Sequence, residues 1–490
     1  MNKAFITFIF SSLFTFQAVA QHDFTFRVNG ISDTTVYLAN YYGGKMYYND
    51  TTVADAKGVI HFKGKETKPG GIYAVVFPDN KTYFEVVVNE PKIEMTTTFI
   101  DPVANMIVNE SEENKAFYTY MKFVTATQKK LMGLSKEKEE TKNEKEKEKI
   151  TAEIKQEQEL AETFKAAYLE KNKDLFAAKV LRTSDDVNVP EFKDAEGKME
   201  DEKRYIYYKA HFLDNVDLTD DRLLRTPVLN QKIATYVEKL TPQVPDSICA
   251  SVQYLTSKTS DTSLIYKFIV QYATNTYEKS DIMGMDAVFV CIAENYYSNG
   301  KAYWLEEDKT KEIVDMYNVR KNLIVGKKAE NIILMDVDSN WRSMYDIKSK
   351  YTVLIFWDPN CGHCKKEMPK LKEFYTDWKS KGVEVYSVST EFDNKDWPKY
   401  IKEKGYTWID VSDNPEINKN AYKYIQEGKT TLNSLNFRDY WDIFSTPQFY
   451  LLDENKVIIA KKINAEQLPD FIKSYEDRQA KIKSAESKTN

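Results

Sequence analysis

Short runs of alternating apolar and polar residues fill the chain from Phe24 to about Phe99. Runs such as FTFRVNG, TTVYLAN and TYFEVVV are separated by turn-forming pairs, of which Asn29-Gly30 is one. Alternation with a period of two residues puts one face of each strand in a core and the other in solvent, and turns at this spacing are typical of antiparallel sheets. We therefore predict a small antiparallel β sandwich within a β-rich domain at residues 21–105.

From residue 106 to residue 325 the apolar residues recur at helical spacing, as at Ile150 and Ile154, while Gly and Pro become rare. This pattern predicts a central all-α domain. Within it, the segment SKEKEETKNEKEKEK from Ser135 to Lys149 has no apolar side chain. We expect a solvated helix with opposite charges four residues apart, and a partner-binding arm is the alternative interpretation.

The last third of the chain alternates strands with helices. The apolar runs YTVLIFW, GVEVYSVS and QFYLLDE have the character of strands, and stretches with helical spacing lie at residues 361–380, 395–405 and 465–480. Such alternation is typical of an α/β layer in which helices cover a partly parallel sheet. We place this domain at residues 326–480 and a polar tail at residues 481–490.

Composition narrows the class of protein. A chain of 490 residues is too long for one ordinary core, so several domains of roughly 100 to 200 residues each are expected. The 69 Lys and Arg residues stand against 75 Asp and Glu residues, for a net charge of -6. Nucleic-acid binding needs a basic face, so we expect no nucleic-acid partner.

The first twenty residues, MNKAFITFIFSSLFTFQAVA, resemble an export signal. They combine the cation Lys3, an apolar stretch, and the small residues Ala18 and Ala20 before a cleavage point ahead of Gln21. This pattern predicts a secretory signal peptide at residues 1–20. An uncleaved membrane anchor is the alternative, which the polar residues inside the stretch disfavour. We therefore expect an exported protein of the periplasm or cell envelope.

Two of the four cysteines, Cys249 and Cys291, lie far apart in the helical region. Buried thiols are the simpler interpretation, and a mutual disulfide stays open because exported proteins keep disulfides.

The other two cysteines, Cys361 and Cys364, lie in FWDPNCGHCKKEMP, directly after an apolar strand. A structural zinc site usually has four N or S ligands, and no second Cys or His pair accompanies them in this domain, so we expect no metal. A disulfide that closes so short a loop constrains the unfolded chain little, which disfavours a purely structural role. A reactive pair is therefore the favoured interpretation.

A reactive role has a specific physical basis here. Cys361 opens a predicted helix, where unpaired backbone N-H groups and the positive end of the helix dipole favour a thiolate. Cys364 follows one turn later and is placed to attack a mixed disulfide formed at Cys361. His363 lies between them, and an imidazole beside a thiolate lowers the cysteine pKa further.

The succession of strand, aromatic residue, CGHC, helix and, later, STPQFYLLDENKVI resembles thioredoxin-fold proteins, in particular exported thiol-disulfide oxidoreductases of the TlpA/ResA type. The resemblance extends from about residue 326 to residue 475 and implies a C-terminal thioredoxin-like fold. It implies a cis peptide at Thr446-Pro447, with the Thr446 backbone free to pair with an extended substrate strand. By the same likeness Trp357, Thr446 and Pro447 contact substrate. The β domain and helical domain upstream resemble, in architecture only, multidomain proteins of Bacteroidetes-type bacteria.

The motif also departs from its relatives. Ile355 occupies the position of the buried aspartate of ordinary thioredoxins, so Glu367 becomes the candidate for proton relay or thiol tuning, with a merely solvated carboxylate equally open. The intervening Gly362-His363 pair is the one that protein disulfide isomerases carry, which leaves the direction of electron flow open. Residues 414–440 resemble an insertion that could shape access to the cysteines.

Together these observations predict an exported thiol-disulfide oxidoreductase, most simply a reductase of the cell envelope, that acts on protein disulfides through Cys361 and Cys364. It needs no cofactor beyond its own redox-active disulfide, because the dithiol carries two electrons. The resemblance implies a membrane thiol carrier as electron donor and a link to cytochrome c maturation. The alternatives are an isomerase or oxidant, and an envelope binding or scaffold protein whose redox domain is accessory.

Overall fold

The computed structural model describes residues 22–79, 81–393 and 395–489, and the predicted signal peptide lies outside them. The chain divides into two compact units. The first unit ends at Leu240 and also includes Lys258–Ile265. The second unit comprises Thr241–Ser257 and the chain from Tyr266 onward. None of the helices among the described residues is long and apolar enough to cross a membrane.

The first unit begins with two four-stranded sheets, ordered β4-β1-β7-β8 and β3-β2-β5-β6. The strands are β1 (His22–Asn29), β2 (Thr35–Tyr42), β3 (Lys45–Val53), β4 (Val59–Gly64), β5 (Gly71–Val76), β6 (Tyr83–Val88), β7 (Lys92–Thr98) and β8 (Ile107–Glu110). The buried rings of Phe26 in β1 and Phe84 in β6 lie 5.6 Å apart across the two sheets, which confirms the predicted sandwich. One strand pair, β1 with β7, is parallel rather than antiparallel; the chain reaches β7 from β6 of the second sheet, so no hairpin joins β7 to β1.

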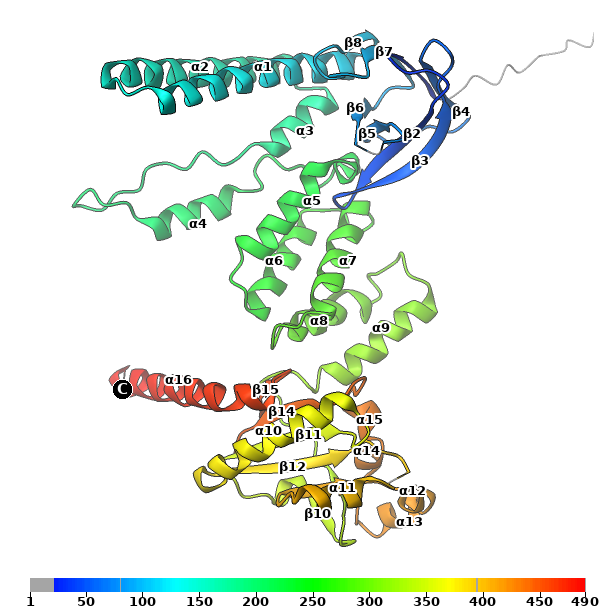
Figure 1. The fold of residues 1–490 in the computed structure, drawn as a ribbon, viewed down its shortest axis with the longest axis vertical. Coiled ribbons are helices and arrows are strands. Elements are labelled where there is room, and N and C mark those ends of the chain that lie inside the picture. The colour runs from blue at the N-terminus through cyan, green and yellow to red at the C-terminus, as the bar shows by residue number, and fades with distance from the viewer. Residues whose placement is uncertain (1–21, 80, 394, 490) are drawn as a thin grey trace, which may run out of the picture. The chain divides into compact units, whose positions relative to one another are not determined.

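Helices follow the sandwich in the same unit. They are α1 (Glu112–Glu140), α2 (Glu144–Lys171), α3 (Phe176–Ser184), α4 (Asp201–His211) and α5 (Pro227–Ala234), with the short turns η1 (Asp221–Arg225) and η2 (Thr235–Lys239). The charged segment predicted as one helix is divided between α1 and α2, which lie side by side (Figure 1). Asn143 caps α2 by accepting a hydrogen bond from Lys145 N-H, and the rings of Phe123 and Phe164 stack at 3.7 Å. These two features fix the chain reversal that the charge pattern did not reveal.

The second unit starts with helices α6 (Pro245–Ser257), α7 (Leu264–Glu278), α8 (Asp286–Ile292) and α9 (Glu307–Arg320), with the turn η3 (Ala293–Tyr297). A disulfide joins Cys249 of α6 to Cys291 of α8. The favoured expectation of two unpaired thiols is therefore wrong. Buried apolar side chains on both helices, such as Val252 and Val288, pack the helices together and bring the two cysteines within reach, with their Cα atoms 6.3 Å apart.

A seven-stranded sheet forms the centre of the C-terminal domain, in the order β10-β9-β13-β12-β11-β14-β15. Its strands are β9 (Ile333–Asp336), β10 (Trp341–Ser343), β11 (Tyr351–Trp357), β12 (Val383–Ser389), β13 (Ile409–Ser412), β14 (Gln448–Leu452) and β15 (Ile458–Lys461). Strands β11, β12 and β13 run parallel to one another, and β14 runs antiparallel to β11. The predicted α/β layer with a thioredoxin-like sheet is confirmed.

Helices cover both faces of this sheet. They are α10 (Gly362–Trp378), α11 (Trp397–Lys404), α12 (Pro415–Lys419), α13 (Ala421–Gln426), α14 (Leu432–Leu435), α15 (Phe437–Tyr440) and α16 (Leu468–Thr489), with the turns η4 (Met344–Asp346), η5 (Lys379–Lys381) and η6 (Ala465–Gln467). One core holds side chains from α10, α11 and α16, and the other holds side chains from α12, α14 and α15. The segment interpreted as an insertion thus supplies helices to the second core, and α16 continues through the stretch predicted as a polar tail.

Candidate active site

Cys361 lies at the start of helix α10, as predicted. Strand β11 is buried along its whole length and ends at Trp357, after which the chain turns sharply. Within the turn, Asn360 N-H donates to Asp358 Oδ1 at 2.6 Å, and Cys361 N-H donates to the Asp358 carbonyl at 3.1 Å. Lys365 N-H then donates to the Cys361 carbonyl at 3.1 Å, the first hydrogen bond of the helix. The Cys361 sulfur therefore stands among backbone N-H groups that the helix leaves unpaired.

The surroundings of Cys361 favour its thiolate. Burial by itself raises the pKa of this half-buried thiol, but hydrogen bonds with the Thr446 side chain and with the backbone N-H groups of Cys364 and His363 outweigh burial. The pKa of Cys361 therefore lies below its ordinary value. A lowered pKa at an accessible sulfur is the property that thiol exchange requires of its attacking group.

Cys364 has the opposite character. Its side chain has no exposed surface, and burial raises the pKa of its thiol to about 12. The Asp358 N-H lies 3.5 Å from its Sγ atom and offers one hydrogen bond. The two sulfurs are not bonded to each other in this structure. The pair thus combines one accessible, acidic thiol with one buried thiol that holds its proton.

The loop before β14 completes the site. The Thr446-Pro447 peptide bond is cis, as the resemblance implied. Cys361 Sγ donates to the Thr446 carbonyl at 3.2 Å, so the loop lies directly against the cysteine at the N-terminus of α10. Thr446 and Pro447 are both partly exposed. The loop therefore borders the Cys361 sulfur, and substrate contact by Thr446 and Pro447 stays a prediction.

Trp357 does not lie where the resemblance put it. Its side chain has no exposed surface and packs in the same core as Cys364, with its ring 5.5 Å from Tyr400 and 6.4 Å from Tyr406. Strand alternation explains the placement, because position 357 points to the core that α10 covers. A side chain without exposed surface does not contact a bound protein. Trp357 therefore supports the cysteines from behind and is not part of a binding surface.

The two candidate tuning residues have other neighbours. The Glu367 carboxylate pairs with Lys370 at 3.0 Å and accepts a hydrogen bond from Ala465 N-H at 3.4 Å. The His363 side chain is exposed, and it is the backbone N-H of this residue that lowers the Cys361 pKa. Tuning by the Glu367 carboxylate or the His363 ring stays a prediction.

Sequence reasoning missed a buried acid in the central sheet of this domain. Ile355, which replaces the aspartate of ordinary thioredoxins, is aligned with Ser387 on β12 and then with Asp410 on β13. Trp408 Nε1 donates to Asp410 Oδ1 at 3.0 Å, while Oδ2 has no partner among the described residues. Burial raises the pKa of Asp410 to about 7. The only signal in the sequence is an aspartate inside the apolar run WIDV, and that strand is too short for alternation to show its direction.

No grouping of three or more His, Cys, Asp or Glu side chains that could hold a metal ion occurs within residues 22–79, 81–393 and 395–489.

Comparison with known proteins identifies families and relatives that parts of the chain resemble. Residues 325–461 match the AhpC/TSA family, and residues 133–322 match a domain of unknown function, DUF5106. The thiol-disulfide oxidoreductase ResA of Bacillus thuringiensis (strain Al Hakam) is 33% identical over 72 residues, which cover 15% of this chain and 42% of that protein. ResA of Geobacillus kaustophilus is 28% identical over 108 residues, covering 22% and 62%. The chain thus spans roughly half the length of these curated relatives.

Among solved structures, a domain of a possible thiol-disulfide isomerase from Cytophaga hutchinsonii is 37% identical and aligns over 32% of this chain and 97% of that one, with a TM-score of 0.27. The C-terminal part of the chain is a thioredoxin-like domain of the AhpC/TSA family with sequence similarity to the thiol-disulfide oxidoreductase ResA.

Proposed function

We propose that the protein is a thiol-disulfide oxidoreductase that exchanges disulfides with protein substrates through Cys361 and Cys364. The observation that carries this proposal is the contrast between the two sulfurs. The accessible Cys361 thiol has a lowered pKa, whereas burial raises that of Cys364 to about 12. The Cys361 sulfur is suited to attack a client disulfide. The Cys364 sulfur stays protonated and is suited to react only after a mixed disulfide has formed.

In the direction of reduction, the Cys361 thiolate attacks one sulfur of a client disulfide. The client S-S bond breaks, the other client sulfur leaves as a thiolate and takes up a proton, and a mixed disulfide remains at Cys361. Cys364 then gives up its proton and attacks the Cys361 sulfur, which releases the second client thiolate. The client has gained two electrons, and Cys361 and Cys364 are joined as a disulfide.

The reduced pair must be restored by a dithiol donor, for which the ResA likeness favours a membrane thiol carrier. The same likeness favours a role as a reductase, with apocytochrome c among its clients. The reduction potential of the pair decides between a reductase and an isomerase or oxidant. A value of about -270 mV fits a reductase, and a value of about -180 mV fits an isomerase.

We place the protein outside the cytoplasm, in the periplasm or cell envelope. The leader pattern at residues 1–20 is one support. The disulfide between Cys249 and Cys291 is an independent one, because structural disulfides persist mainly in oxidising compartments.

The test is a trapping experiment with the full chain. In a Cys364→Ala variant the mixed disulfide cannot be resolved, so client proteins should stay attached through Cys361 and separate from it when a reductant is added. The control is Cys361→Ala, which should trap no clients. Partner capture that survives loss of both cysteines would contradict the proposal and support the binding-protein alternative.

A further inference from the structure

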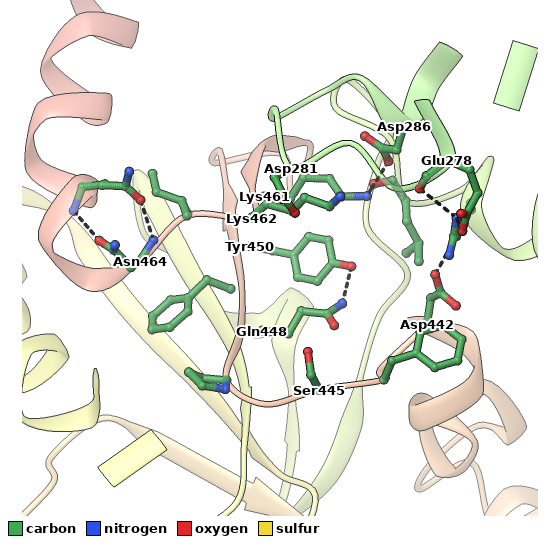
Figure 2. Close-up of a pocket in the computed structure, with 17 residues that line it drawn as sticks. Glu278, Asp281, Asp286, Asp442, Ser445, Gln448, Tyr450, Lys461, Lys462 and Asn464 are labelled. Atoms are coloured by element: carbon green, nitrogen blue, oxygen red, sulfur yellow. Dashed lines mark hydrogen bonds and ion pairs between the residues drawn. The ribbon is translucent and has the colours of Figure 1, made fainter. Parts of the chain in front are cut away.

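A groove opens beside the cis-proline loop of the second unit, with a cavity volume of about 520 Å³ (Figure 2). The loop itself, with Phe444 and Pro447, forms one wall. Residues at helix ends form the other wall: Glu278 ends α7, Asp286 begins α8 and Arg320 ends α9. The thioredoxin-like domain thus shares this groove with the helical segment that precedes it in the chain.

The cations of the groove already donate to protein atoms. Arg320 donates from Nε to Asp442 at 2.8 Å and from Nη1 to Glu278 at 3.0 Å. Lys461 donates to Asp286 Oδ2 at 2.7 Å and to the Leu323 carbonyl at 2.8 Å, within the network that Figure 2 draws. Lys462, the remaining cation, donates to the Ser280 carbonyl at 2.6 Å. A bound anion would therefore compete with existing partners for each of them.

At least one hydrogen-bond acceptor of the groove lacks a donor. Asp286 is 5% exposed, and its Oδ1 atom has no hydrogen-bond partner among the described residues. A buried carboxylate oxygen without a donor is costly, and a donor brought in by a ligand removes that cost. Asp281 is exposed and lines the same groove. The lining residues include four carboxylates against three cations, so the groove suits a positively charged hydrogen-bond donor.

The groove lies close to the reacting sulfur. Cys361 Sγ is 3.2 Å from the Thr446 carbonyl. Thr446 stands between Ser445 and Pro447, both of which line the groove. An extended polypeptide advances about 3.3 Å per residue. A client joined to Cys361 would therefore reach the groove within a few residues of its own cysteine.

We propose that this groove binds a lysine or arginine side chain of the client, a few residues from the cysteine that reacts with Cys361. This inference rests on the proposed exchange activity and adds a preference among its substrates. The cation is received by Asp286 Oδ1 and by Asp281 at the mouth. Phe444, which is 81% exposed on the rim, offers an aromatic face to the cation or to its aliphatic stem.

The test compares peptides with the full-length, reduced protein. Three peptide disulfides, identical except for Lys, Gln or Glu near the cysteine, are reduced in single-turnover reactions at low salt. We expect the Lys peptide to react about threefold to tenfold faster than the Glu peptide, with the Gln peptide between them. High salt should shrink this ratio.

Variants identify the residues responsible. Asp286→Asn retains an acceptor for Lys461 and should lower the ratio of Lys-peptide to Glu-peptide rates. Asp281→Lys lies at an exposed position, where the substitution should not affect folding, and it should reverse the preference for the Lys peptide over the Glu peptide. The matched control Asp308→Asn removes an exposed carboxylate of α9 outside the groove and should leave the ratio unchanged. Equal rates for the three peptides, or a ratio unaffected by Asp281→Lys, would overturn the inference. Failure to reduce any of the peptides would instead overturn the proposed function.

Discussion

The Sγ atom of Cys361 lies 3.2 Å from the carbonyl oxygen of Thr446, although the two residues are 85 positions apart in the sequence. Hydrogen bonds with the Thr446 side chain also act to lower the pKa of both sulfurs, although burial still raises that of Cys364 to about 12. One residue of the loop before β14 therefore acts on Cys361 and Cys364 together. This makes Thr446 a positioning residue whose contribution can be measured.

A Thr446→Val variant keeps the shape of the side chain and removes its hydroxyl. Because the hydroxyl lowers the pKa of Cys361, that pKa should rise, and alkylation of Cys361 by iodoacetamide at about pH 7 should slow severalfold. The pH profile of the alkylation rate measures the shift directly. Ser445→Ala removes the neighbouring hydroxyl and serves as the control. An unchanged profile in Thr446→Val would show that the hydroxyl does not tune the thiol.

The two thiols should differ sharply in reactivity in the folded protein. Cys361 is accessible and its pKa lies below the ordinary value, so near pH 7 it should react faster than a free cysteine in a peptide. Cys364 is buried and its pKa is raised to about 12, so it should stay unmodified until the domain unfolds. Mass spectrometry of the alkylated protein, with and without denaturant, distinguishes the two sites. Equal labelling of both cysteines in the native state would contradict the asymmetry of the site.

The raised pKa of Asp410 should make the free energy of unfolding depend on pH. Its pKa rises from an ordinary 3.8 to about 7 in the folded protein. Between these values the folded chain holds a proton that the unfolded chain releases, so the free energy of unfolding falls as the pH rises and levels off above about pH 7. The full effect is on the order of 4 kcal/mol.

Asp410→Asn cannot ionise, so it should gain stability relative to the parent protein between about pH 5 and about pH 8. Urea unfolding followed by tryptophan fluorescence at the two pH values gives the comparison. Asp377→Asn, on the exposed face of α10, is the control and should show no such gain. A parent protein and an Asp410→Asn variant with parallel pH profiles would rule out a titrating Asp410.

The disulfide between Cys249 and Cys291 should stabilise the second unit. The two residues are 42 positions apart, and closing a loop of that length in the unfolded chain contributes up to about 4 kcal/mol. A double Cys249→Ala, Cys291→Ala variant should unfold at lower denaturant concentration while its Cys361 alkylation rate is retained. Peptide mapping without reductant checks the pairing itself. Loss of the bond without loss of stability would mean that helices α6 and α8 are held by packing alone.

How well the sequence predicts a structural element depends on the length of that element. It also depends on how far apart in the sequence the residues lie that contact each other. Strand β11 was predicted residue for residue, because a strand buried on both faces is a continuous apolar run. Strands β9, β10, β13 and β15 have three or four residues each and show no measurable period.

In the candidate site, too, local features could be predicted from the sequence, whereas contacts between remote residues could not. The helix start at Cys361 is a local property and could be predicted from the adjoining strand, whereas the burial of Trp357 depends on Tyr400 and Tyr406, which are remote in the sequence. The pairing of Cys249 with Cys291 and the groove beside Pro447 both depend on how α6 to α9 pack. No pattern along the chain encodes that packing in readable form.

The second unit carries one cysteine pair that is closed and one that is open. Cys249 is 8% exposed and is already bonded to the partly exposed Cys291, whereas Cys361 is a partly exposed free thiol. The native chain should therefore carry two electrons, through Cys361 and Cys364, even though it contains four cysteines. Its redox cycle can turn over without loosening the helices that flank it.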